Sequence, residues 1–340
     1  MSITLKILAV TAMYPHPGHE GYGAFVMQQV EQLRLLKHQV DVLHFQGYRS
    51  KLEYVKAAIQ VRRRTRSAKY DVVHAHYGLT GIAAVFRSAT PLVITFHGSD
   101  VLIGRLQPMI SRWACRFADA AIAVSKQIAA IVPGEIIPCG VDLNLFHPKR
   151  RADARKRLGL ALDKKYVLFP FGPRRTVKRF DLAAAAVNRL AARGLNVELL
   201  TVCQVPNAEM PWYYSAADAM ILSSDSEGSP TSVKEALACN LPVVTTDVGD
   251  VREIGEGITG FQICAQTAES LADGLETVLH SGLGLAFDGH AAMRRYSLEQ
   301  TALAIVQVYR RAMKERSSRR EKGCARAAGA GNQSGSPGLQ

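Results

Sequence analysis

The chain has 340 residues, of which 48% are hydrophobic and 21% charged, a composition typical of globular proteins. Its 42 lysines and arginines outnumber its 29 aspartates and glutamates, and the resulting net charge of +13 favours anionic partners. The length predicts two domains of about 150 residues each. Charged residues, histidines or prolines interrupt every apolar stretch before the roughly 20 residues that a membrane-spanning helix needs, which excludes an integral membrane protein.

The cysteines and the N-terminal run indicate the compartment. Six cysteines are scattered without a CxxC pair or a zinc-like spacing, which predicts free thiols in a reducing cytosol. The first apolar run is short and ends at Pro15 without a small-residue cleavage site, so we interpret it as a buried strand and not as a signal peptide. We therefore expect a cytoplasmic protein.

Short runs rich in Ile, Val and Leu alternate with longer helical patterns along the chain, which predicts parallel strands covered by helices on both faces. In the first half we expect strands at 6–11, 39–45, 71–75, 92–96 and 120–124, with an amphipathic helix at 24–36. In the second half we expect strands at 166–169, 197–202, 219–223, 242–246 and 260–263. The pattern predicts an α/β protein with two doubly wound domains.

The alternation of strand and helix patterns is interrupted at residues 138–157, and we place the domain boundary there. The sequence predicts an N-terminal domain at 1–148, a C-terminal domain at 149–295 and a last helix at 296–316 that packs back toward the N-terminal domain. Residues 317–340 read as a disordered basic tail. Eight basic and two acidic residues lie between Arg310 and Arg326, so almost half of the net charge belongs to this end of the chain.

The segment DSEGSPTSVKEALACNLP (225–242) follows one predicted strand and precedes the next. Ser229 and Pro230 predict a helix start with Ser229 as the N-cap, and Asn240 predicts a left-handed stop. Backbone N–H groups of Gly228 and its neighbours would then open at the strand's carboxyl end, where a sugar hydroxyl or a phosphate can accept from them.

Two carboxylates in this segment stand eight positions apart. Glu227 would lie in the loop, and Glu235 in the second turn of the helix with its side chain directed back toward the loop, so both can face one crevice. That arrangement suits the binding of polyols. The alternative is that Glu235 pairs with Lys234 or an arginine on a solvated helix face, and the spacing alone does not decide between them.

The whole segment resembles the E-x7-E region of retaining glycosyltransferases of GT-B family 4, in which E-G-x-P is followed by K-E-A. Four more segments resemble landmarks of that family in the same order: the glycine-bearing loop 21–25, ITFHGSD (94–100), PCGVDLNLFHP (138–148) and RRTVKRFD (174–181). The resemblance covers nearly the whole chain up to the tail. It implies the GT-B fold, in which two Rossmann-like domains face each other across a cleft.

The segment RRTVKRFD crowds basic side chains into one strand-to-helix loop, and a diphosphate leaving group needs such cations. By resemblance, Arg175 and Lys178 would bind the phosphates of a donor, with Arg174 in reserve. The family more often has its arginine directly after the glycine, where this chain has Pro173, so the choice between the two arginines stays open. The alternative is a solvated loop that only adds charge.

In the first half, the resemblance implies that His97 reaches the sugar of the donor or the acceptor hydroxyl. The alternative is that His97 is a packed loop residue and that Ser99 or Asp100 caps the helix that follows. Gly23 resembles the family's glycine at a close approach of backbone to ligand. His74 and His76 alternate along one strand, and without a third ligand at a recognisable spacing we favour strand-end packing or acceptor contact over a metal site.

The resemblance implies transfer of a hexosyl or related unit from a nucleotide-diphosphate sugar to an acceptor hydroxyl, with retention and without a metal or other cofactor. Glu227 would bind sugar hydroxyls and Glu235 ribose hydroxyls, with Gly228, Ser229 and Pro230 beside them at the donor. The acceptor would be a sugar or a lipid-linked glycan in cell-surface polysaccharide or glycolipid synthesis. The chain has no D-x-D pair of carboxylates for a divalent cation.

Basic residues at 62–69 close a predicted helix at 54–66, and with the tail they could hold the protein on an anionic membrane surface; the alternative is a solvated helix end.

Two other functions compete with glycosyl transfer. A GT-B-like sugar-nucleotide epimerase or phosphorylase would share the architecture but need no glycosyl acceptor. A nucleic-acid-binding protein would use the same charge, but the chain lacks a recognisable reading module, so we expect no nucleic acid.

Overall fold

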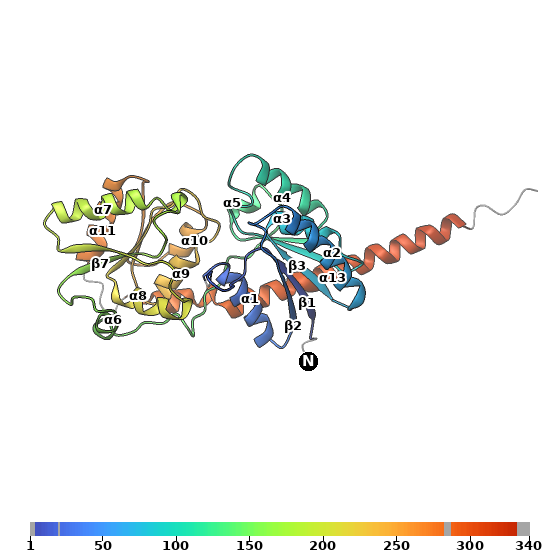
Figure 1. Ribbon diagram of the computed structural model, residues 1–340, viewed down its shortest axis with the longest axis horizontal. Helices are drawn as coiled ribbons and strands as arrows, with labels where there is room; N and C mark the ends of the chain where they lie inside the picture. The colour runs from blue at the N-terminus through green and yellow to red at the C-terminus, as the bar shows by residue number, and fades with distance from the viewer. Residues whose placement is uncertain (1–3, 20, 282–286, 332–340) are drawn as a thin grey trace, which may run out of the picture.

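The computed structural model describes residues 4–19, 21–281 and 287–331, in which two parallel sheets, each covered by helices on both faces, lie beside each other (Figure 1). Within the described residues, no helix is long and apolar enough to cross a bilayer. The predicted class, α/β with two doubly wound domains, is confirmed.

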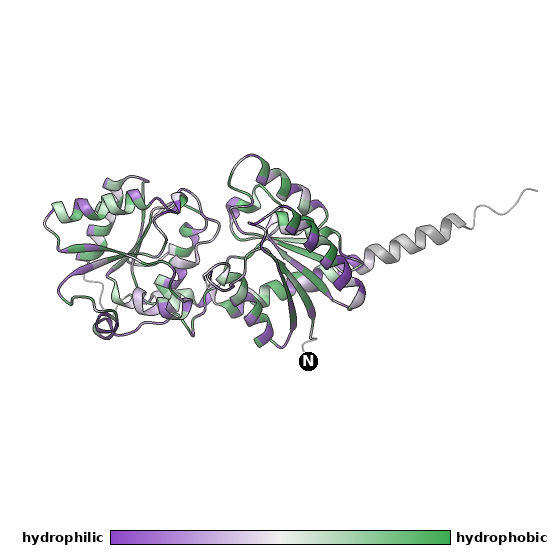
Figure 2. Ribbon diagram, viewed as in Figure 1, coloured by the Kyte–Doolittle hydropathy of each residue, from purple (hydrophilic) through white to green (hydrophobic). Residues whose placement is uncertain are grey.

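The N-terminal sheet has six parallel strands in the order β2-β1-β3-β4-β5-β6. The strands are β1 (Lys6–Thr11), β2 (Gln39–His44), β3 (Val72–His76), β4 (Leu92–Phe96), β5 (Ala120–Ala123) and β6 (Glu135–Ile136). Its helices are α1 (Ala24–Leu35), α2 (Leu52–Ser67), α3 (Gly78–Val85), α4 (Leu106–Arg116) and α5 (Lys126–Ala129). Every residue of β3 and β4 is buried, because both faces are covered, and the apolar strands are the green arrows of Figure 2.

Alternate residues of these strands enter different cores. Leu8 and Val73 pack with α2, α3, α4 and α5, whereas their neighbours Ile7 and Val72 pack with α1 and with the last helix of the chain. The period of two along a strand therefore assigns α2–α5 to one face of the sheet and α1 to the other.

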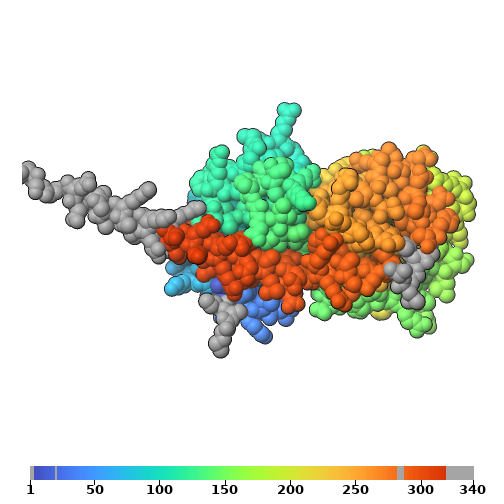
Figure 3. All heavy atoms as spheres, turned by 180° about the vertical axis from the view of Figure 1, so that it is seen from behind, coloured from blue at the N-terminus to red at the C-terminus, as the bar shows by residue number. Residues whose placement is uncertain are grey.

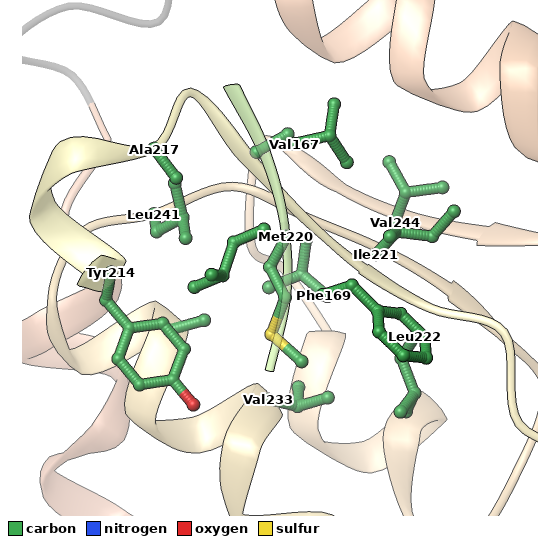
Figure 4. Close-up of a cluster of buried hydrophobic side chains, with 14 of the residues drawn as sticks. Val167, Phe169, Tyr214, Ala217, Met220, Ile221, Leu222, Val233, Leu241 and Val244 are labelled. Carbon is green, nitrogen blue, oxygen red and sulfur yellow. The ribbon is translucent and has the colours of Figure 1, made fainter. Parts of the chain in front are cut away.

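The C-terminal sheet has five parallel strands in the order β11-β10-β9-β7-β8. They are β7 (Lys165–Phe169), β8 (Val197–Thr201), β9 (Ala219–Leu222), β10 (Val243–Thr246) and β11 (Phe261–Cys264). The surrounding helices are α6 (Arg151–Leu158), α7 (Phe180–Ala192), α8 (Met210–Ala216), α9 (Thr231–Ala238), α10 (Val251–Gly255), α11 (Ala268–His280) and α12 (Gly289–Ala292), with 3-10 turns at Thr176–Lys178, Asn207–Glu209 and Met293–Tyr296. Met220 of β9 lies in the middle of this core between Tyr214 of α8 and Val233 of α9 (Figure 4).

The last helix, α13 (Leu298–Gly331), leaves the C-terminal domain and lies along the N-terminal one (Figure 3). Ile305 and Tyr309 of α13 are buried against Ile7 and Val72 of the N-terminal sheet. The structure continues α13 through residues 317–331, where the sequence predicts disorder, because Ala, Arg, Lys and Glu favour helix. Residues 332–340 of the predicted tail lie outside the described residues.

The chain crosses between the domains twice, and the two crossings are hydrogen-bonded to each other. The N–H of Val141 donates to the carbonyl of Tyr296, and the N–H of Leu298 donates to the carbonyl of Val141. Both linkers therefore pass through one narrow region between the domains.

Candidate functional site

Loops at the carboxyl ends of β4 and β9 bring the two domains into contact. A Cβ atom on Gly228 would overlap the carbonyl oxygen of His97, and one on Gly98 would lie 2.9 Å from the backbone nitrogen of Gly228. Gly98 also has a φ of +124°, which side chains rarely permit. The fold thus brings together His97 and Glu227–Gly228, which the sequence places 130 residues apart.

Lys178 and Glu227 form an ion pair at this edge of the C-terminal sheet. Lys178 Nζ lies 2.5 Å from Glu227 Oε1, which also accepts from Ser224 Oγ at 2.7 Å. The side chains are only 7% and 14% exposed, and Nζ lies 3.9 Å from the ring centroid of Phe171. Burial lowers the pKa of Lys178, while the carboxylate of Glu227 acts in the opposite direction. The alternative of a purely solvated basic loop does not hold for Lys178.

Arg174 and Arg175 are exposed beside this pair, whereas Arg179 is held by Asp181 and Asp225. Burial raises the pKa of Tyr77 in the N-terminal domain, and the positive charge of Arg175 opposes that rise. The same charge also lowers the pKa of Lys178. Arg175 is therefore close to both domains, which favours it over Arg174 as a cation of the cleft.

Glu235 lies in the second turn of α9, and its Oε2 accepts a hydrogen bond from the hydroxyl of Tyr214 at 2.8 Å. Burial raises the pKa of Glu235 to about 7, although the Tyr214 hydroxyl acts to lower it. The predicted left-handed stop at Asn240 is confirmed by its φ of 55°.

The start of α9 differs from the sequence prediction, because Pro230 is the N-cap and Thr231 the first helical residue. The side chain of Ser229 is used elsewhere: its Oγ donates to Asp250 at 2.7 Å and accepts from Lys234 Nζ at 2.5 Å. The predicted Ser229 cap is therefore wrong. What Ser229 can still offer a ligand is its backbone N–H.

Lys234 is fully buried and joins the domains. Its Nζ donates to the carbonyl of Cys139 in the first linker at 2.9 Å, and it lies 3.3 Å from Asp250 Oδ2. The alternative pairing of Lys234 with Glu235 on a solvated face is therefore not what the structure has. Sequence reasoning missed this role, and the only signal was an apolar neighbourhood around Lys234.

His97, which is partly exposed, stands at the end of a row of histidines whose other members, His76 and His74, are buried. Its Nε2 lies 3.0 Å from His76 Nδ1, and the rings of His76 and His74 follow with centroids 4.4 Å apart. His74 is in turn bonded to Tyr309 of α13 at 2.7 Å. Burial lowers the pKa of all three imidazoles, so each is neutral at pH 7. The sequence indicated strand-end packing or acceptor contact for His74 and His76 but not the contact of His76 with His97.

Two more features shape the N-terminal side of the site. Gly23 precedes α1 with a φ of +72°, and a Cβ there would overlap the backbone of Met13. Asp100 accepts from the N–H groups of His97 and Gly98 and from Gly78 at the start of α3, so it fixes the loop and caps α3 instead of the helix that follows it.

A pocket of about 210 Å³ lies next to this loop in the N-terminal domain. Its wall includes Tyr22, Tyr48, Tyr54, Tyr77, Ser99 and Gln107. Among the described residues, no three His, Cys, Asp or Glu side chains are grouped as a metal site requires.

Comparison with known proteins identifies the family. Residues 152–298 match the model "Glycosyl transferases group 1", and residues 19–145 match "Glycosyltransferase Family 4", so that together the two models span most of the chain. The chain belongs to glycosyltransferase family 4. It is therefore a transferase of the GT-B fold, as the resemblance implied.

Relatives in this family differ in what they act on. TuaC of Bacillus subtilis (strain 168), which carries a provisional assignment as a glycosyltransferase of teichuronic acid biosynthesis, is 27% identical over 81% of this chain and 90% of its own length. A D-inositol 3-phosphate glycosyltransferase of Xylanimonas cellulosilytica is 28% identical, covering 74% of each chain.

Solved structures with the same fold share less sequence with this glycosyltransferase. A sucrose-phosphate synthase from Thermosynechococcus elongatus superimposes with a TM-score of 0.76 at 20% identity, covering 91% of this chain and all of that one. Anabaena HepE in complex with UDP-glucose has a TM-score of 0.66 at 20% identity, covering 89% of this chain and 98% of its own.

Proposed function

We propose that this glycosyltransferase moves a hexosyl unit from a nucleotide-diphosphate sugar to an acceptor hydroxyl with retention at the anomeric carbon and without a metal ion. The observation that carries the proposal is the meeting of the Lys178–Glu227 pair with the His97 loop of the other domain. Such a site holds opposite charges and backbone groups from both domains around one point between them.

The leaving diphosphate would bind at Arg175 and Lys178. Arg175 is exposed and acts electrostatically on both Lys178 and Tyr77, so its charge is directed at the space between the domains. Fixed cations there stabilise the negative charge that develops on the departing phosphate. A divalent cation has the same effect in metal-dependent transferases. Arg174 stands next to Arg175 in the same exposed loop.

The sugar and ribose would be held by carboxylates and backbone groups. Glu227 accepts from sugar hydroxyls, and its engagement with Lys178 and Ser224 suits binding better than attack as a nucleophile. Glu235 accepts from the ribose hydroxyls, while the N–H groups of Gly228 and Ser229 before α9 donate to oxygen atoms of the donor, with Pro230 shaping the turn.

Without a covalent glycosyl-enzyme intermediate, retention requires that the acceptor attack from the face that the diphosphate leaves. The departing phosphate, held by Arg175 and Lys178, would take the proton of the acceptor hydroxyl on that face, so the protein mainly positions the reactants. His97, neutral and oriented by His76, would hold the sugar from the N-terminal side.

The acceptor would enter the pocket lined by Tyr22, Tyr48 and Tyr77 beside the His97 loop. Tyrosines combine ring faces with hydroxyl groups, a chemistry that suits a sugar ring. Relatives named for teichuronic acid biosynthesis and for D-inositol 3-phosphate support a polyhydroxylated acceptor, in the synthesis of a cell-surface polysaccharide or glycolipid. HepE with UDP-glucose supports a UDP-sugar as the first donor to test.

The test begins with thermal denaturation in EDTA against UDP, GDP, ADP and their hexose conjugates, since a ligand that binds the folded state raises the melting temperature. We expect one nucleotide family to raise it. Incubation of that donor with saccharide and lipid-linked acceptors should give a product of retained anomeric configuration by NMR. Turnover of the donor to an epimer, or transfer of its sugar to phosphate, without an acceptor would instead identify an epimerase or a phosphorylase.

A further inference from the structure

Large apolar side chains are exposed on the outer surface of two helices of the N-terminal domain. On α4, Leu106 (69% exposed), Met109 and Trp113 recur at helical spacing, and Phe117 follows directly after the helix. On α2 the same is true of Leu52, Val55 and Ile59. Both helices pack against α3 on one face of the sheet, so the two stripes belong to the same side of the domain (Figure 1).

Exposed arginines lie between and beyond the apolar residues of α2 and α4. They are Arg62, Arg63 and Arg66 on α2, Arg105 just before α4, and Arg112 and Arg116 on α4. In the part of the chain that the structure describes, none of the six forms an ion pair, whereas exposed arginines of the C-terminal domain such as Arg189 and Arg252 do. Hydrophobic and hydrophilic bands alternate along α4 in Figure 2.

A helix face that only meets water is polar, and an exposed apolar patch of this kind marks a surface that contacts something else. Leu, Met, Phe and Trp beside unpaired arginines match the interfacial region of an anionic bilayer. There the apolar side chains enter the acyl boundary, while the guanidinium groups meet phosphates. A protein partner would need acidic groups at each of these positions to match the same surface.

The acceptor pocket lies at the end of both stripes. Its wall includes Tyr54 in the first turn of α2 and Gln107 in the first turn of α4, together with Tyr48 from the loop before α2. Leu52 and Leu106, the first apolar residues of the two stripes, are therefore within a turn of pocket residues.

We propose that the outer surface of α2 and α4, the α2–α4 face, docks on an anionic lipid bilayer and brings the pocket to the headgroup level. The docking rests on the exposed residues alone. Its consequence for the substrate, that the acceptor is anchored in the lipid, rests on the proposed function.

The test is flotation of the full-length protein with vesicles of phosphatidylcholine alone or with 30 mol% phosphatidylglycerol, a composition set on the order of a bacterial anionic membrane. We expect binding to the anionic vesicles, and a loss of at least tenfold in partition coefficient for Leu106→Glu and Trp113→Glu. Leu162→Glu, in the C-terminal domain at 68% exposure, is the matched control for Leu106 at 69% and should bind like wild type. In a Trp212→Phe background, the emission of Trp113 should shift to the blue on binding.

Equal binding of Leu106→Glu and Leu162→Glu would overturn the proposal, and so would equal binding to neutral and anionic vesicles. A dimer in analytical ultracentrifugation that Leu106→Glu dissociates, without vesicle binding by wild type, would assign the face to a second copy of the chain instead. Flotation uses no donor. The docking proposal can therefore fail while the donor still binds, and a failure of donor binding would not change the flotation result.

Discussion

Lys178 and Glu227 form a largely buried ion pair beside the loop of His97. Each is largely buried, and each has the other as its nearest opposite charge, so removal of either leaves a charge without its partner beside the donor site. The pair therefore sets both the position of Lys178 toward the phosphates and the position of Glu227 toward the sugar.

We predict that Glu227→Gln and Lys178→Ala each lower turnover at least about tenfold, or roughly 1.4 kcal/mol in transition-state stabilisation. Steady-state rates with the donor identified by thermal denaturation measure this, with circular dichroism as the check on folding. Arg189→Gln, which removes an exposed charge from α7, is the control and should keep its rate. Rates near wild type in both site variants would refute the assignment.

Glu235 predicts a pH dependence for donor binding. Burial raises its pKa to about 7, and only the ionised carboxylate accepts from both ribose hydroxyls, so donor affinity should rise as pH increases from 6 to 8. Calorimetric titration of the nucleotide across this range tests the direction. In Glu235→Gln the rise should vanish; a wild-type affinity that falls with pH would contradict the role.

His76 should act as a positioning residue for His97. Both imidazoles are neutral, so the contact between His76 Nδ1 and His97 Nε2 holds one proton and fixes the tautomer of His97, whose Nδ1 lies 4.0 Å from Cys139 Sγ. We predict that His76→Leu lowers kcat more than it raises KM, and that His76→Asn, whose amide can occupy the Nδ1 position, restores part of the rate. The ¹⁵N shifts of His97 should report a changed tautomer in His76→Leu, and unchanged shifts would argue against this role.

Sequence reasoning at the residue scale found the groups that carry charge but not all of their partners. Glu227, Lys178 and His97 stand in recognisable motifs, whereas the bond from His97 to His76 depends on β3 and β4 being neighbours in the sheet. The sequence offered Lys234 only as an alternative partner of Glu235 on a solvated face, because its actual partners, Cys139 and Asp250, come from segments that only the folded chain brings near.

At the scale of elements, the loops after β4 and β9 determine how closely the domains approach. The backbone of Gly228 packs on the carbonyl of His97, so we predict that Gly228→Ala separates the loops and lowers turnover more than tenfold. The affinity for the nucleotide should fall by less than about threefold, because the substitution leaves the nucleotide's own contacts with the C-terminal domain in place. Titration calorimetry and rate measurements on the same sample separate the two effects, and equal losses in both would contradict this explanation.

The strands were predictable because most of them are continuous apolar runs buried on both faces, and their observed ends match the predicted ones or differ from them by one residue. The exception is β6, whose two residues are exposed and have no apolar run to reveal them. The predicted start of α9 was one residue too early. Ser229 is hydrogen-bonded to Asp250, and this tertiary contact overrides the local capping preference.

At the scale of the whole molecule, Lys234 holds the linker between the domains. Its ammonium binds the carbonyl of Cys139 and lies beside Asp250, which is 3% exposed, so Lys234→Met leaves a buried carboxylate without its cation. We predict a loss of about 3 kcal/mol in the free energy of unfolding, measured by urea denaturation. Lys164→Met, which removes the exposed pair with Glu198, is the control and should leave the midpoint unchanged; equal midpoints in both variants would contradict the prediction.

The return of α13 to the N-terminal domain has a consequence for synthesis on the ribosome. Ile305, Tyr309 and Ala312 complete a core that otherwise consists of residues of the N-terminal domain and of α13 itself. The strands and most helices of the C-terminal domain are contiguous, so that domain can finish folding while one face of the first domain still lacks its cover. The domain that emerges first is therefore the last to be complete, and a ribosome that stalls before Leu298 releases a chain with an open apolar sheet face that chaperones and proteases can recognise.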